Sequence, residues 1–191
     1  MSHIKNINAL EILDTKELSG IPATPIWKAE ALASLGRYQD AEEALSKVKK
    51  SHPLYSQTQL ARARIQIALN KTGASITTLN ALATSKIPSI RNTANLLAAE
   101  IHISETHFDL ATKSLDNIDE QNPGAAKLKE YLRARLLLNE GEATDAINQF
   151  QSLITAPDHL NERIFRACVL GLADAQAANQ QSDIAITTLS Q

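Results

Sequence analysis

Residue types that stabilise many non-helical folds are scarce in this chain of 191 residues. Aromatic residues make up 4% of it, and it holds only 6 glycines and 6 prolines. A strand-rich fold would need more Val, Tyr and Phe. The apolar content is carried mainly by Ala, Leu and Ile, with which helices pack at close range. The composition therefore predicts an all-α fold, and nothing in it divides the chain into two unlike halves.

Disulfides, excess charge and long apolar runs are also missing. The single cysteine, Cys168, cannot form an internal disulfide, and 19 basic residues balance 21 acidic ones, so no general field attracts nucleic acid or anionic lipid. No apolar run approaches the roughly 20 residues that cross a bilayer. The start MSHIKNINALEIL has no continuous apolar stretch of the kind that signal peptides carry. We expect a soluble chain without nucleic-acid partners or membrane insertion, in an unknown compartment.

Two helical patterns meet in LGRYQDAEEAL, residues 35–45. Apolar residues mark one helical face that ends at Gly36 and a second face that ends before Pro53. Gly36 suits a helix C-terminus because glycine adopts a positive φ at little cost. The stretch therefore predicts two helices joined by a tight turn.

The same unit recurs along the chain. A small residue lies in the middle of each first helix, at Ala29, Ala63, Ala99, Ala134 and Ala173, with spacings of 34, 36, 35 and 39 residues. Large residues recur in the second helices, at Leu45, Leu79, Leu115 and Phe150. Two antiparallel helices can approach closely only where facing side chains are small and large ones fill the space beside them. The period predicts stacked helix hairpins that cover one another's apolar faces.

The opening stretch resembles the tetratricopeptide repeat, with Gly36, Tyr38, Ala41, Leu45 and Pro53 on its signature positions. Later copies are weaker, and the second has Ser75 in place of the small alanine. The resemblance implies a right-handed α-solenoid of about five divergent repeats over residues 22–191. Their approximate bounds are 22–55, 56–91, 92–126, 127–165 and 166–191. Residues 1–21 are expected to form an N-terminal helix or half-repeat, and the lack of polar capping helices indicates a piece of a larger protein.

By the same resemblance, the first helices line a concave groove that receives a peptide or a helix of another protein. One inward row is apolar and comprises Ile26, Leu60, Leu96, Tyr131 and Leu170. The next row alternates in charge and comprises Glu30, Arg64, Glu100, Arg135 and Asp174. The charged row either forms neighbouring pairs that neutralise one another or offers polar contacts to a ligand backbone. The apolar row either contacts the ligand or packs between repeats.

One particular function of this family is not expected. The carboxylate clamp that grips chaperone tails needs Lys, Asn and Arg, but the corresponding positions carry Ile26, Glu30, Ala61, Thr93 and Leu97. A shift by one repeat also fails. The sequence therefore gives no support for a chaperone-binding repeat protein.

No motif indicates catalysis, a metal site or a cofactor. His102 and His107 are five residues apart, whereas ligands on one helical face are three or four apart, so EIHISETHFD is interpreted as a solvated turn. Cys168 lies in an apolar helical stretch and is interpreted as a small core residue. We expect a non-enzymatic module that binds another protein. The alternative is a structural spacer or self-assembly element, with a homodimer formed through the open repeat ends.

Overall fold

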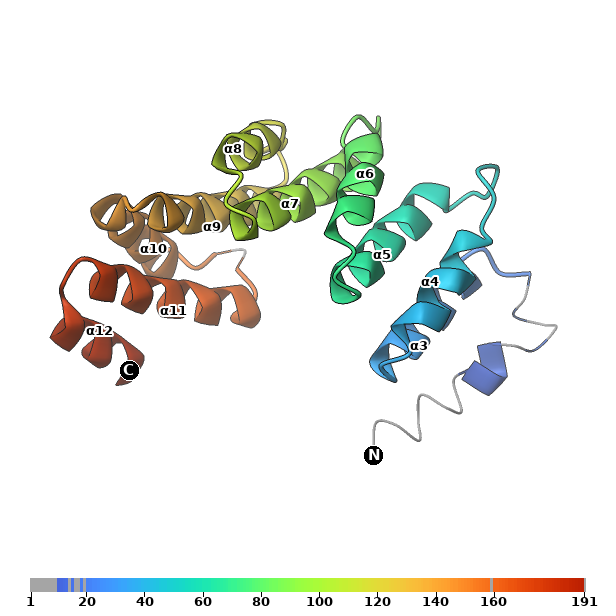
Figure 1. Cartoon of the computed structure of the whole chain (residues 1–191), viewed down its shortest axis with the longest axis horizontal. Coiled ribbons are helices and arrows are strands. Elements are labelled where there is room, and N and C mark those ends of the chain that lie inside the picture. Colours follow the sequence, from blue (N-terminus) through green and yellow to red (C-terminus); the bar gives the residue numbers. More distant parts are fainter. Residues whose placement is uncertain (1–9, 14, 16–17, 19, 159, 191) are drawn as a thin grey trace. The chain divides into compact units, whose positions relative to one another are not determined.

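The chain is all-α. The computed structural model describes residues 10–13, 15, 18, 20–158 and 160–190, and the regular elements among them are all helices (Figure 1). The helices are α3 (Thr24–Ser34), α4 (Tyr38–Ser46), α5 (Tyr55–Ala68), α6 (Thr72–Leu82), α7 (Pro88–Ser104), α8 (Phe108–Asp116), α9 (Pro123–Glu140), α10 (Ala143–Thr155), α11 (Glu162–Ala178) and α12 (Ser182–Ser190). The predicted fold class is confirmed as an all-α helical repeat. The half-repeat predicted for residues 1–21 falls largely outside the described residues.

The chain divides into two compact units, residues 1–90 and 91–191. In the first unit α3 packs on α4, α5 packs on α6, and α5 also contacts both α3 and α4. Its core includes Ala29, Leu32, Ala41, Leu45 and Ile65, with Leu10 packed against them. Consecutive hairpins therefore share one apolar core, as the period predicts.

The second unit contains most of α7 and the helices α8 to α12. One cluster of buried residues joins α7, α8 and α9 through Ala99, Leu115 and Leu132. A second cluster joins α9, α10 and α11 around Phe150 and Cys168, and α11 packs on α12. Among the described residues of both units, no helix is long and apolar enough to cross a membrane.

The small and large positions of the repeat are buried as predicted. The five recurring alanines are at most 3% exposed, and the four large residues beside them are at most 1% exposed. Ser75, which replaces the alanine in the second copy, is also fully buried. Its hydroxyl donates a hydrogen bond of 3.1 Å to the Ala63 carbonyl on the facing helix. That bond satisfies the polar group that the substitution introduces.

The turn within each hairpin repeats one backbone geometry. Each turn contains one residue with a left-handed backbone, whose φ lies between 57° and 89°. In the described hairpins, in chain order, these residues are Gly36, Asn70, Thr106, Gly141 and Gln180. The next residue donates its N–H to the carbonyl five positions earlier; these bonds include Arg37 to Leu32 at 2.9 Å and Lys71 to Gln66 at 2.8 Å. This is the Schellman motif, which satisfies the last carbonyls of the first helix. Gly36 was expected from the sequence, but Asn70, Thr106 and Gln180 adopt the same conformation without being glycine.

Candidate functional site

Four residues of the predicted groove line one open pocket on the second unit. Tyr131 and Arg135 come from α9, and Leu170 and Asp174 come from α11. The pocket has a volume of about 580 Å³ and is completed by Leu138, Asn139, Phe150, Ala167 and Gly171. The helical register therefore brings an apolar, an aromatic and two oppositely charged side chains to one place.

Arg135 is the most constrained charged group of this pocket. Its Nη1 lies 3.5 Å from Glu100 Oε1 on α7, and its guanidinium carbon lies 5.8 Å from the centroid of the Tyr131 ring, within cation–π range. Burial raises the pKa of the Tyr131 hydroxyl, so the ring stays neutral under ordinary conditions. Asp174 makes no ion pair with any described residue. One pair of the charged row has therefore formed, and one carboxylate remains available for a ligand.

The apolar residues of the second unit differ in exposure. Leu170 is 57% exposed, whereas Leu96 is half-buried against the core shared by α7, α8 and α9. Tyr131 contacts that core and also the one shared by α9, α10 and α11. Leu170 can therefore present its side chain to a ligand, while much of Leu96 and Tyr131 is used in packing.

The predicted groove residues of the first unit lie on α3 and α5. Ile26 is half-buried and Glu30 is exposed on α3, while Arg64 is exposed on α5. Leu60 is only 8% exposed and lies in the core. Within the described part of this unit, no ion pair joins Glu30 to Arg64. The first unit therefore offers two exposed charges that do not pair with each other, Glu30 and Arg64. In the second unit, Glu100 and Arg135 do form a pair.

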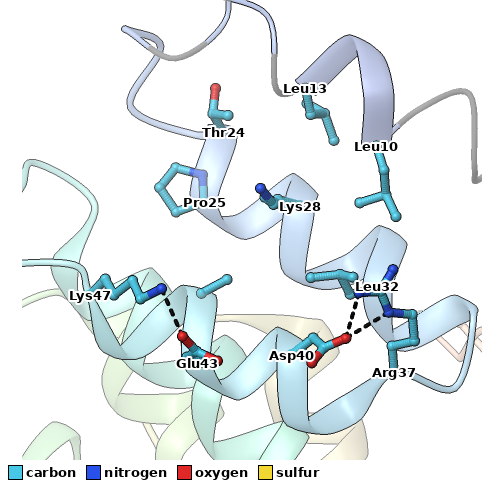
Figure 2. A pocket seen from close by; sticks show the side chains of 11 residues that line it. Leu10, Leu13, Thr24, Pro25, Lys28, Leu32, Arg37, Asp40, Glu43 and Lys47 are labelled. Carbon is cyan, nitrogen blue, oxygen red and sulfur yellow. Dashed lines mark hydrogen bonds and ion pairs between the residues drawn. The ribbon is translucent and has the colours of Figure 1, made fainter.

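A second pocket, of about 550 Å³, lies where the N-terminal segment meets the first hairpin (Figure 2). Leu10 and Leu13 from that segment and Leu32 from α3 supply apolar surface. Two exposed ion pairs border it, Arg37 with Asp40 at 2.6 Å and Lys47 with Glu43 at 2.8 Å. None of these residues was predicted from the sequence to bind a ligand. Because Leu10 also packs on the core of the hairpin, we interpret this pocket as a packing junction.

Gly171 has a structural role that sequence reasoning missed. A Cβ atom at this position would lie 2.5 Å from Cζ and 2.7 Å from Cε1 of Phe150. Because carbon atoms in contact are about 3.5–4.0 Å apart, only glycine fits there without movement. The missing side chain lets α11 approach the Phe150 ring on α10. The available signal was a glycine inside a helical pattern, where it costs about 1 kcal/mol relative to alanine.

Cys168 lies in the core, as the apolar stretch around it predicts. Its side chain is fully buried, and burial raises the pKa of the thiol to about 11. The thiolate is the nucleophilic form of cysteine. At neutral pH this residue is therefore a small apolar core group and not a nucleophile.

The comparison with known protein families supports the helical repeat architecture. Residues 27–55, which cover most of α3 and all of α4, match the family model of the tetratricopeptide repeat. The match covers one repeat, and the count of about five stays a prediction. The chain matches no curated protein and no solved structure significantly. Tetratricopeptide repeats generally form non-enzymatic modules for protein–protein interaction, because their stacked hairpins create extended binding surfaces.

Proposed function

We propose that the chain is a non-enzymatic interaction module that holds a peptide or helix of a partner protein against its first helices. The main support is the pocket on α9 and α11, which contains Tyr131, Arg135, Leu170 and Asp174. The family resemblance and the repeat register together selected these four residues, and they line one pocket. Repeat proteins use such surfaces for binding.

The pocket favours a segment with one apolar side chain flanked by exposed backbone. Leu170 offers an exposed apolar side chain whose burial contributes about 1 kcal/mol or more. Arg135 and Asp174 supply a donor and an acceptor beside it. Micromolar affinity corresponds to about −8 kcal/mol, so several further contacts along the segment are needed. The two charges set the register of the segment more than its affinity.

The test is selection of peptides from a displayed random library, followed by measurement of their affinities by fluorescence anisotropy. Leu170→Glu places a charge in the pocket and is expected to weaken the selected peptides at least tenfold, since it removes apolar contact and buries an unpaired carboxylate. Leu110→Glu is the matched control, because Leu110 is a similarly exposed leucine on α8 outside the pocket. That control should leave the affinity unchanged.

Two results would refute the pocket as the binding site. One is the same affinity for wild type and for Leu170→Glu when circular dichroism shows that both are folded. The other is an equal loss in Leu110→Glu, which would assign the effect to the added charge in general.

A second candidate function is self-assembly, and the surface of α12 favours it. Ile184, Ile186 and Leu189 on this helix are 51%, 63% and 56% exposed. Exposed apolar side chains that share a face are common at protein interfaces, and Ile186 and Leu189, three residues apart, share one face of α12. Self-assembly through α12 predicts a dimer in light scattering that Ile186→Lys dissociates. Ile87→Lys, at another exposed isoleucine, should leave it intact, and a monomeric wild type would exclude this candidate.

A further inference from the structure

The turn between α7 and α8 gathers three potential metal ligands. One ligand atom each from His102, Glu105 and His107 lies within 4.8 Å of the others. The Nδ1 of His107 and the Oε2 of Glu105 are already 3.5 Å apart. Two imidazoles and a carboxylate form a donor set that suits divalent transition metals.

The Schellman turn explains how residues five apart come together. Thr106 has a φ of 59°, and the His107 N–H donates a hydrogen bond of 2.8 Å to the His102 carbonyl. The two imidazole centroids are 6.1 Å apart. Ligands three or four residues apart share a face only on a continuous helix. Because α7 ends at Ser104, this spacing does not apply to His102 and His107.

The equivalent positions of the other turns do not repeat this pair. Among the described hairpins they are Leu32 with Arg37, Gln66 with Lys71, Leu137 with Glu142, and Gln176 with Gln181. These four turns form the same hydrogen bond with other residues at the two positions. A histidine at both is therefore not required by the turn itself.

His102 is also less well satisfied than the glutamines that occupy its position in other repeats. Gln66 and Gln176 are buried, and their Oε1 atoms accept hydrogen bonds from Thr78 and Thr188 at 3.4 and 2.8 Å. His102 is only 7% exposed, yet its buried Nδ1 has no hydrogen-bond partner. A buried polar atom without a partner costs free energy. Coordination of a metal through this nitrogen would compensate that cost.

The other two ligands can adjust to a bound ion. Glu105 and His107 have exposed side chains and can rotate toward a common centre.

We propose that His102, Glu105 and His107 bind a borderline divalent transition metal such as Zn²⁺ through three protein ligands. Zinc–ligand bonds of about 2.0–2.1 Å place tetrahedral ligands about 3.3 Å apart. The 3.5 Å between His107 and Glu105 is close to that value, and rotation of their exposed side chains closes the remaining gap to His102. The fourth position is filled by water or by a ligand from a partner.

The test titrates the folded chain with Zn²⁺ in isothermal calorimetry and with Co²⁺ in visible absorption. Wild type is expected to bind one ion per chain. His107→Ala and Glu105→Gln change exposed residues and should each weaken Zn²⁺ at least tenfold. His102→Gln installs the residue found in two other repeats and should do the same while the chain stays folded. Asp109→Asn, at an exposed neighbouring carboxylate, is the control and should stay within about twofold of wild type.

Three results would overturn the proposal. The first is the absence of saturable Zn²⁺ binding below about 1 mM. The second is retention of wild-type affinity by both His107→Ala and Glu105→Gln, which would locate the ion elsewhere. The third is an equal loss in Asp109→Asn, which would indicate attraction of the cation by local charge alone.

Discussion

Replacement of Gly171 by alanine should destabilise the second unit although alanine is the better helix former. The added Cβ would lie 2.5, 2.7 and 3.0 Å from three atoms of the Phe150 ring. The ring would have to move by about 1 Å to restore a contact of about 3.5 Å. Phe150 lines the pocket beside Gly171, but its side chain is fully buried in a core cluster, so a shift of the ring disturbs the side chains packed around it. Overpacking of this kind costs about 1–3 kcal/mol, and the gain in helix propensity offsets about 1 kcal/mol of it.

The assay is urea unfolding followed by circular dichroism, with Gly73→Ala as the matched control. Gly73 lies in the first turn of α6, and a Cβ there would meet no atom within 4 Å. The control should therefore gain up to about 1 kcal/mol. We expect the free energies of unfolding of the two variants to differ by about 1–3 kcal/mol, with Gly171→Ala the less stable.

A double substitution separates the clash from other effects of alanine. Phe150→Leu replaces the ring with a smaller side chain. At the preceding contact between hairpins, leucines already occupy the equivalent positions, Leu115 on α8 and Leu132 on α9. In the Phe150→Leu background, Gly171→Ala should cost less than in wild type, with a coupling of about 1 kcal/mol or more. The reasoning is refuted if the coupling is zero, or if Gly171→Ala is as stabilising as Gly73→Ala.

Two further predictions follow from the perturbed ionisable groups. The thiol of Cys168, with a pKa of about 11 and full burial, should react with DTNB at about pH 8 far more slowly in the native chain than in urea; equal rates would show that the helix opens readily. The hydrogen bond from Lys71, at 2.6 Å, and that from Gln66, at 3.0 Å, hold the pKa of Glu42 below its ordinary 4.5. The stabilisation from Glu42 is thus fully present above about pH 4.5 and is lost as the pH falls through the lowered pKa. In urea unfolding, Glu42→Gln should cost about 1 kcal/mol at pH 7 and nothing in acid, and a loss that does not depend on pH would contradict this account.

The candidate pocket was partly predictable from the sequence. The register selected Tyr131, Arg135, Leu170 and Asp174 because residues at the same place in each repeat lie on the same side of the first helices. Asn139 and Ala167 were not selected, although they line the same pocket. Their inclusion depends on how closely α9 and α11 approach each other, which a one-dimensional period does not contain.

The sequence by itself determined the all-α class, the helix hairpins and the positions of the small core residues. It could do so because close helix packing requires a small side chain at a fixed place in each repeat, as at Ala63 and Ala134. Tertiary structure decided the features that depend on a specific approach of two segments. Gly171 is needed because the Phe150 ring lies against it. His102 and His107 come together because the backbone reverses at Thr106, whereas helical periodicity places residues five apart on different faces.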